Sequence, residues 1–373
     1  MAAVTAGDIL VVDAGSSSLR LSVYGSGGEE RANRSFGEPP GERAGESLAE
    51  FLRDAPPVVA AGHRLVHGGP GITRPSVVDD TVRAELDRAA GLAPLHVPPA
   101  LAALDAAREL LPEVPHVVCP DTAFHAELPE AARAYGLPKE WTERYGLRRY
   151  GFHGLSCAWT LERAARLLGR PAGELHLVIA HLGGGCSATA VREGRSADTT
   201  MGLTPLEGMV MSKRSGSVDP GLLLWLQTSA GLPAGRLAEV LNRESGLLGL
   251  SGSSGDTREL VAAAGRGDRD AAFALEVFTL EARRGVARVA ASLDRLDALV
   301  FTGEIGEDQP EVREAVCAGL GVLGVRGGLA PGNPESDAIV SPAGAAVPVL
   351  VVPVGEARQI ALETRAALAG RAG

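Results

Sequence analysis

The sequence predicts an α/β fold built from two related halves. Residues 9–24 (ILVVDAGSSSLRLSVY) and residues 177–191 (LVIAHLGGGCSATAV) share one design. In each, an apolar run leads to a polar residue, Asp13 or His181, then to a turn rich in glycine or serine and a strand of alternating character. Glycine lets backbone N–H groups approach a phosphate, and serine hydroxyls add donors. One such hairpin alone is equally an ordinary turn, but one in each half predicts a duplicated nucleotide-binding fold.

Strands and helices alternate along the rest of the chain, as is typical of α/β folds. Short apolar runs predict strands, and longer segments with apolar residues at helical spacing predict helices. The polar segment 25–45, rich in glycine and proline, is expected to form a loop or a weak edge strand. The other expected strands cover residues 58–61, 116–119, 177–180, 299–301 and 347–352, and the expected helices cover residues 82–90, 98–111, 161–168, 222–226, 237–241, 271–293 and the segment after Glu356.

Length and charge limit the class of protein. A chain of 373 residues exceeds one typical core, so two domains are expected, and a hydrophobic content of 45% is enough to form both cores. The formal charge of −10 and the isoelectric point near 5.4 argue against a nucleic-acid or membrane-surface partner. An anionic substrate remains possible, because it needs only a local cationic site.

The cysteines and the N-terminus indicate the compartment. The opening segment MAAVTAGDIL has no basic region followed by a long apolar stretch, so no signal peptide is expected. No apolar run reaches the roughly 18–20 residues that would span a bilayer. Cys119, Cys157, Cys186 and Cys317 are scattered without a Cys-x-x-Cys pair. We therefore expect a cytoplasmic protein with reduced thiols and no zinc site.

Four residues in turns after strands could carry chemistry. Arg64 follows an apolar strand in GHRLVHGG, and Arg214 lies in the long loop PLEGMVMSKRSGSVDPG. A guanidinium matches carboxylate or phosphate oxygens, although a single arginine is more often a solvated surface charge. Asp121 ends a strand and could instead cap the following turn, and His153 in RRYGFHG could be a core histidine. Together with two phosphate turns, these residues are what phosphoryl transfer to an anionic acceptor requires.

Longer motifs identify a resemblance to a known family. The chain is similar nearly end to end to the acetate kinases, of the superfamily that includes sugar kinases, actin and heat-shock ATPases. The resemblance implies duplicated actin-like ATPase domains, of ribonuclease H-like fold, with a cleft between them. It places one domain at residues 1–122 plus 355–373 and the other at 123–354. The matching motifs are VVDAGSSSLR, GHRLVHGG, LAPLHVPPAL, DTAFHAELP, RYGFHGLS, HLGGGCSATAVREGRSADTTMGLTPLEG, RSGSVDP, SGLLGLSG, DTREL and FTGEIGED, whereas residues 25–55 do not match.

The resemblance also implies a role for each matched residue. Asp121, His153 and Arg214 correspond to catalytic residues of the family, and Asp13 and Glu356 to positions that support Mg²⁺ or Mn²⁺. Arg64 would bind the acyl carboxylate, and Val66, Leu95, Phe152 and Pro205 would form the acyl pocket. The implied nucleotide- and phosphate-binding residues are Ser16, Ser18, Arg20, His181, Gly183, Gly184, Gly185, Asp256, Thr257, Arg258, Glu304, Ile305, Gly306, Glu307 and Asp308.

The departures from the family pattern gather on the nucleotide side. Asp13 and Gly184 stand where the family has Asn, and Arg20 stands where it has Lys. Lys213 replaces a small polar residue. Glu304 replaces the first glycine of a GIGEN-like loop that ends here at Asp308. The resemblance implies reversible phosphoryl transfer between ATP–Mg²⁺ and acetate or propionate by a cytoplasmic homodimer. Two alternatives stay open, namely another phosphoryl donor such as pyrophosphate, and a weakly catalytic ligand-binding homologue.

Overall fold

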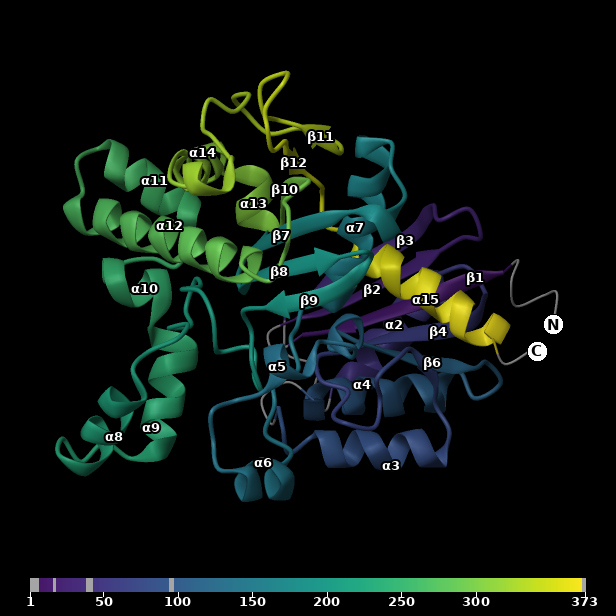
Figure 1. The fold of residues 1–373 in the computed structure, drawn as a ribbon. Helices are drawn as coiled ribbons and strands as arrows, with labels where there is room; N and C mark the ends of the chain where they lie inside the picture. Colours follow the sequence, from purple (N-terminus) through teal and green to yellow (C-terminus); the bar gives the residue numbers. More distant parts are fainter. Residues whose placement is uncertain (1–6, 16–17, 38–42, 94–96, 371–373) are drawn as a thin grey trace. The chain divides into compact units, whose positions relative to one another are not determined.

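The chain forms two compact units, each with a six-stranded sheet (Figure 1). The computed structural model describes residues 7–15, 18–37, 43–93 and 97–370. The first unit comprises Met1–Ala126, Phe152–Trp159 and Gly355–Gly373, and the second comprises Glu127–Gly151 and Thr160–Val354. The predicted α/β class is confirmed. The domain limits expected from the sequence, 1–122 with 355–373 and 123–354, stay a proposal.

The sheet of the first unit has the order β3-β2-β1-β4-β6-β5. Strands β3, β2 and β1 are antiparallel neighbours, β1, β4 and β6 run parallel, and β5 is antiparallel to β6. The carboxyl ends of the three parallel strands therefore meet at one edge of the sheet. The strands are β1 (Asp8–Ala14), β2 (Leu19–Tyr24), β3 (Glu30–Phe36), β4 (Val58–Leu65), β5 (Ser76–Val77) and β6 (His116–Pro120).

Helices cover both faces of this sheet because its central strands are apolar on both sides. In β1, Leu10 and Val12 pack in the core formed with α2 (Ala44–Asp54) and α4 (Val97–Leu110). The alternate residues, Ile9 and Val11, pack against α15 (Glu356–Gly370) and the start of α7 (Gly154–Leu168). The remaining helices of this unit are α3 (Asp80–Ala89) and the 3-10 turn Ala123–His125.

The sheet of the second unit repeats this topology, with the order β9-β8-β7-β10-β12-β11 when read from its antiparallel hairpin edge. Its long helix α12 packs on β7 and β8. The strands are β7 (His176–Leu182), β8 (Cys186–Arg192), β9 (Arg195–Thr199), β10 (Ala298–Thr302), β11 (Ala338–Ile339) and β12 (Val349–Val351). The helices are α5 (Glu130–Arg133), α6 (Lys139–Tyr145), α8 (Pro220–Thr228), α9 (Ala234–Glu239), α10 (Gly246–Ser251), α11 (Thr257–Gly265), α12 (Arg269–Ala290), α13 (Glu304–Asp308) and α14 (Pro310–Ala318), with short turns at Ala172–Glu174, Val240–Glu244 and Gly321–Leu323.

The structure corrects several sequence-based expectations. Strand β4 runs to Leu65, so Arg64 lies within the strand and not after it. The Glu304–Asp308 segment is a short helix, not a loop, and it follows Gly303 at a φ of +82°. The helix expected at 161–168 begins earlier, at Gly154. The segment 25–45 contains the exposed edge strand β3, which was one of its two predicted alternatives.

Within the described ranges, every helix falls short of the length or the apolar character that crossing a membrane requires. All four cysteines are buried.

Candidate active site

The carboxyl edge of the first sheet brings three charged side chains together. Asp13 lies near the end of β1, Arg64 in β4, and Asp121 directly after β6. The register of the strands brings these three side chains together. Val12 pairs with His63 across β1 and β4, and Leu65 pairs with Pro120 across β4 and β6. Side chains at the ends of adjacent parallel strands necessarily share one edge, which is where open α/β sheets bind ligands.

Arg64 joins the two carboxylates. Its Nη2 lies 2.8 Å from Asp121 Oδ2 and its Nε lies 3.3 Å from Oδ1, so the guanidinium contacts both oxygens of one carboxylate. Its Nη1 donates to Asp13 Oδ1 at 3.1 Å. The Asp121 side chain is 1% exposed, whereas those of Arg64 and Asp13 are 17% and 15% exposed. The cluster therefore opens to solvent on the Arg64 side.

Burial and neighbouring charges shift the pKa values of Asp121 and Arg64. Burial raises the pKa of Asp121 to about 6, although Arg64 acts in the opposite direction; Glu356 and Asp13 add to the increase. Burial also disfavours the charge on Arg64, but Asp121, Asp13 and Glu356 outweigh it and raise the pKa of Arg64 well above its usual value. One guanidinium thus serves several carboxyl groups, and burial holds the pKa of Asp121 above its usual range.

Asp121 does not cap the turn that follows it. The N-cap of the Ala123–His125 turn is Thr122, and the Thr122 hydroxyl instead accepts from the backbone N–H of Gly68 at 3.2 Å. The Asp121 carbonyl accepts from the backbone N–H of Gly154 at 2.9 Å, which brings the start of α7 beside it. A Cβ at Gly154 would collide with that carbonyl. The adjacent His153 has a φ of +58°, an uncommon conformation that holds it at this junction.

Two of the four predicted acyl-pocket residues lie near this edge of the sheet. Val66 and Phe152 are both buried, and the Phe152 ring contacts His67 edge to face with ring centroids 5.5 Å apart. His125 donates from Nε2 to the Phe152 carbonyl at 2.9 Å, and burial lowers its pKa to about 4, so it is neutral. Leu95 lies outside the described residues, and Pro205 belongs to the second unit. His125 is a supporting residue that sequence reasoning missed, although it lies in the DTAFHAELP motif.

The first phosphate turn is only partly described. Ser16 lies outside the described residues. The Ser18 carbonyl accepts from the backbone N–H of Gly15 at 2.9 Å, which closes the turn. Arg20 pairs with Asp13 across β1 and β2 and is exposed.

The second phosphate turn is tight and rich in backbone contacts. The backbone N–H of Gly183 donates to the Gly185 carbonyl at 3.0 Å, and His181 is buried two residues before the turn. A Cβ at Gly303 would collide with the Leu182 carbonyl, so the turn abuts the start of α13. Glycine is required at 303 by this close approach and by its positive φ.

Arg214 lies in the second unit, in the loop between β9 and α8. Its Nη1 donates to the Pro205 carbonyl at 2.8 Å, which places two predicted site residues in contact. Burial raises the pKa of Cys186 to about 12, while the Gly183 carbonyl and Arg214 act in the opposite direction. Arg214 is therefore close enough to the glycine turn to influence its last residue electrostatically.

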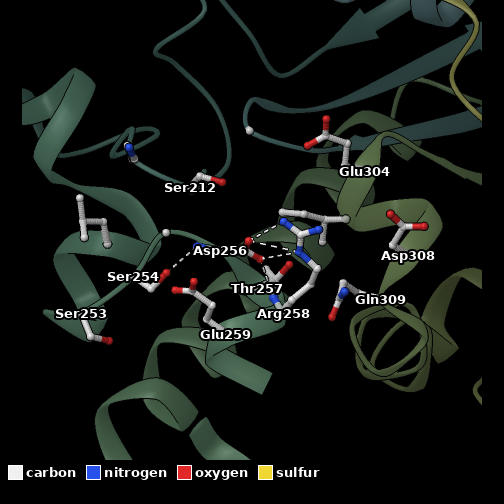
Figure 2. A pocket seen from close by; sticks show the side chains of 15 residues that line it. Ser212, Ser253, Ser254, Asp256, Thr257, Arg258, Glu259, Glu304, Asp308 and Gln309 are labelled. Carbon is white, nitrogen blue, oxygen red and sulfur yellow. Dashed lines mark hydrogen bonds and ion pairs between the residues drawn. The ribbon is translucent and has the colours of Figure 1, made fainter. Parts of the chain in front are cut away.

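A cavity of about 660 Å³ in the second unit is lined by seven of the fifteen predicted nucleotide- and phosphate-binding residues (Figure 2). Gly184 borders it from the second phosphate turn, and α11 and α13 supply other parts of its wall. Gly183, Gly185 and His181 are not among its lining residues. The lining residues are Gly184, Ser212, Lys213, Leu248, Ser253, Ser254, Gly255, Asp256, Thr257, Arg258, Glu259, Glu304, Ile305, Asp308 and Gln309. The serine- and glycine-rich stretch before Asp256 was not assigned from the sequence, although it follows the SGLLGLSG motif.

Asp256 and Arg258 form a compact unit at the start of α11. The Asp256 carboxylate accepts from the Arg258 backbone N–H at 2.8 Å and caps the helix. Arg258 Nη2 also lies 2.6 Å from Asp256 Oδ2, and this pairing lowers the pKa of Asp256 (Figure 2). The Arg258 side chain stays 73% exposed, so it can still contact an anionic ligand.

Some residues of α13 line the cavity, and others hold the helix in place. Glu304 and Asp308 are exposed and line the cavity. Glu307 turns inward, and its Oε1 accepts from the backbone N–H groups of Gly303 at 2.9 Å and Val354 at 2.8 Å. The buried Arg313 donates to the Gly306 carbonyl at 2.9 Å. Glu307 and Arg313 therefore fix the helix that carries the two lining carboxylates.

The donor set of the first unit fits a hard divalent cation. Asp13 and Glu356 are both near Arg64, because both raise its pKa. Among the described residues, no group of three or more His, Cys, Asp or Glu side chains has metal-binding geometry. Mg²⁺ is usually held by one or two carboxylates together with substrate phosphates. Two carboxylates therefore suffice for Mg²⁺ that arrives with a nucleotide.

The chain is similar to acetate kinases and a propionate kinase over most of its length. The sequence model of the Acetokinase family matches residues 46–362. An acetate kinase of Deinococcus deserti is 48% identical over 323 residues, covering 85% of this chain and 80% of the relative. An acetate kinase of Clavibacter michiganensis subsp. michiganensis is 43% identical over 396 residues, covering 97% and 99%. A propionate kinase structure from Francisella tularensis superposes with a TM-score of 0.88 at 32% identity, covering 96% of this chain and 99% of that chain.

Proposed function

Because the chain belongs to the acetokinase family, we propose that it transfers a phosphoryl group reversibly from ATP–Mg²⁺ to acetate or propionate, giving the acyl phosphate and ADP. The observation that carries this proposal is the Arg64–Asp121 pair at the carboxyl edge of the first sheet. The guanidinium of this pair is a suitable receptor for the carboxylate of a small acid, because its planar fork matches carboxylate oxygens. The enzyme is a kinase with a carboxyl group as acceptor.

The reaction forms one bond and breaks another. A carboxylate oxygen of acetate bonds to the γ-phosphorus of ATP, and the bond from that phosphorus to its bridging oxygen breaks, so that ADP leaves. We assign Arg64 to the acyl carboxylate, and Asp121 to its orientation and proton balance. His153 and Arg214 stabilise the charge on the transferring phosphoryl group. Positioning and cations supply most of the catalysis in such a transfer.

Asp13 and Glu356 would hold the magnesium ion. Bound there, the ion would neutralise phosphate charge and order the phosphate chain. Arg64 already donates to Asp13, so one carboxylate serves both the acid-binding arginine and the metal position. Manganese has the same preference for oxygen ligands and is an expected substitute.

The cavity favours a nucleotide over pyrophosphate as donor. Its volume of about 660 Å³ lies within the range of roughly 300–1,000 Å³ that accommodates whole cofactors and similar ligands. Pyrophosphate would leave much of that volume empty, whereas a nucleoside could contact Thr257 and Arg258 at the start of α11.

Trapping of the acyl phosphate tests the proposal directly. Hydroxylamine converts acyl phosphate to a coloured hydroxamate, which is measured with ATP, GTP and pyrophosphate in turn. We expect product with ATP and acetate, less with GTP, and none with pyrophosphate. Product with pyrophosphate alone would replace the donor, and no product with any donor would refute the enzymatic assignment.

We further propose a homodimer formed through α8. Every residue of α8 is exposed or half-exposed, although the helix carries the sequence PGLLLWLQT. Leu222, Leu224 and Trp225 are 46%, 62% and 58% exposed, which is an unusual density of large apolar groups on one surface helix. A second copy of the chain could cover this face symmetrically. Light scattering should give twice the chain mass for the wild type and a monomer for Leu224→Glu.

We place the protein in the cytoplasm on the basis of its buried cysteine thiols.

A further inference from the structure

A buried arginine in the second unit has no part in the proposed chemistry. Arg149 precedes α7 and its side chain is only 5% exposed. Its Nη1 donates to the carbonyls of Thr200 and Met201, both at 3.0 Å, and its Nη2 lies 2.7 Å from Glu207 Oε1. An arginine at this depth costs stability unless every donor is satisfied. All of these contacts lie in one loop, residues 200–208.

Glu207 is held from a second side by Tyr135. The Tyr135 hydroxyl donates to Glu207 Oε2 at 2.5 Å and accepts from the backbone N–H of Leu203 at 2.8 Å. The Arg149 guanidinium also lies 5.5 Å from the centre of the Tyr135 ring. Arg288 is a further charged neighbour, with Nη2 3.9 Å from Glu207 Oε1, and its side chain is half exposed. We call Arg149, Tyr135 and Glu207 the Glu207 cluster.

The Glu207 carboxylate and the Tyr135 hydroxyl pack directly against Gly202. A Cβ added at Gly202 would collide with the Glu207 carboxylate and with the Tyr135 hydroxyl. The Gly202 carbonyl accepts from the backbone N–H of Tyr150 at 3.0 Å, which fixes the loop on its other side. Hydrogen bonds from Arg149 and Tyr135 therefore hold the Glu207 carboxylate against this loop.

The segment that follows this loop carries Arg214. Pro205 lies two residues before Glu207, and its carbonyl accepts from Arg214 Nη1 at 2.8 Å. The next residue after Glu207, Gly208, donates from its backbone N–H to the Ser217 hydroxyl at 3.1 Å and accepts from the Ser217 backbone N–H at 2.8 Å. Contacts on both sides of Glu207 thus reach the segment that carries Arg214.

From this chain of contacts we infer that the Glu207 cluster is a positioning device for Arg214, and that it acts through the Pro205 carbonyl. The inference rests on the proposed function, in which Arg214 stabilises the transferring phosphoryl group. None of the three cluster residues lines the nucleotide cavity, so the cluster should influence the chemical step and not nucleotide binding. A displacement of about 1 Å in a catalytic group can lower a rate by roughly a hundredfold.

Steady-state kinetics separate positioning from a merely structural role. Glu207→Gln keeps the shape of the side chain and removes its charge. We expect kcat to fall by about tenfold to a hundredfold while the KM for ATP changes by less than about twofold. Tyr135→Phe removes one hydroxyl and should lower kcat by a smaller factor. Glu127→Gln, which breaks the exposed pair with Arg195 in the same unit, is the matched control and should have the kinetics of the wild type.

Two further outcomes decide the inference. A lower thermal midpoint with an unchanged kcat in Glu207→Gln would show that the cluster only stabilises the fold, and would overturn the inference. If Glu207→Gln does not fold, Tyr135→Phe and Gly202→Ala replace it, because Gly202→Ala displaces the carboxylate without changing its charge. A wild-type kcat in both of these variants would likewise overturn it. An inactive wild type would contradict the proposed function, whereas an active wild type with normal variants would contradict only the positioning role.

Discussion

The two sheets have the same strand order but carry different residues where their parallel strands end. In the first, β1, β4 and β6 end near Asp13, Arg64 and Asp121, which are all charged. In the second, the corresponding ends of β7 and β10 carry His181 and Thr302, which pair across the two strands. Topology fixes where a site can lie, and side chains at the strand ends decide what it can bind.

This difference has a physical consequence in each unit. Buried charges need partners, so the first edge is an ion cluster in which Arg64 serves Asp13 and Asp121. The second edge is bordered by a glycine turn and opens toward a polar cavity of about 660 Å³. We therefore expect substitutions in the first unit's cluster to act mainly on the chemical step, and substitutions in the cavity to act mainly on nucleotide affinity.

The largest expected effect comes from Asp121→Asn. Asparagine keeps the shape but neither the charge nor the titration of the buried carboxyl group. We expect kcat to fall by about a hundredfold or more, as when a group that stabilises transition-state charge is removed. The thermal midpoint should fall less than in an Arg64 variant, because Arg64 keeps Asp13 as a partner. Acyl phosphate formation and thermal unfolding measure the two effects, and retained activity would show that Asp121 is only a structural anchor.

Arg64→Ala should have the next largest effect. It removes a charge-assisted contact to the acid and leaves Asp121 buried without its main partner. A loss on the order of 2–4 kcal/mol at the transition state corresponds to roughly a thirtyfold or greater fall in kcat/KM for acetate. The KM for ATP should hardly change. Arg34→Ala on the exposed edge strand β3 is the control for removal of an arginine from the same sheet. Near-normal acetate kinetics would end the assignment of the acid site to this edge.

Activity and the free energy of unfolding should change in opposite directions as pH rises toward the pKa of Asp121. The pKa of Asp121 is raised by burial from 3.8 to about 6, so the folded chain binds more protons than the unfolded chain between these values. The contribution of Asp121 to the free energy of unfolding therefore decreases as pH rises from about 4 to about 6. If the carboxylate form is the active one, activity should fall about tenfold per pH unit below that pKa.

Comparison of wild type with Asp121→Asn isolates this contribution. Glu363 in α15 also has its pKa raised, to about 7, with burial as the main cause, and it contributes to stability with the same sign. Glu363 is present in both proteins, so the difference between their unfolding free energies reports Asp121 together with its effect on Glu363, because the charge of Asp121 is a minor cause of the raised pKa of Glu363. A difference that does not vary between about pH 4 and pH 6 would show that Asp121 is ionised throughout this range in the folded chain.

Short sequence motifs predicted the site residues at strand ends, but not the contacts between residues far apart in the sequence. The strand ends at Asp13 and Asp121 were predictable because an apolar run followed by a polar residue marks the end of a buried strand. The α13 helix was not, because five residues after a glycine give no helical period to detect. The Glu207 cluster joins residues 58 and 72 positions apart, and no local pattern pairs such residues. The sequence marked Lys213 only as a departure from the family pattern. Its position in the cavity wall depends on tertiary structure.

The smallest expected effect concerns Glu304. It tests the expectation that substitutions in the cavity of the second unit act on nucleotide affinity. Glu304 is exposed, lines the cavity, and lies close enough to raise the pKa of Arg258, behind the larger effect of Asp256. One negative charge at about 10 Å from a nucleotide of charge near −2 opposes binding by less than about 1 kcal/mol in water. Glu304→Gly should therefore lower the KM for ATP about two- to fivefold, with kcat and the acetate KM unchanged.

Glu304→Gln separates charge from bulk in this effect. If charge is responsible, Gln and Gly should lower the KM for ATP equally, and the gain should shrink as salt screens the interaction over the Debye length of about 10 Å at 0.1 M. If bulk is responsible, only Gly should act, and salt should not matter. An unchanged KM in both variants would mean that the nucleotide does not approach this side chain. A collapse of kcat in either variant would refute the division of roles between the two sheets, because a residue of the cavity wall would then control the chemical step.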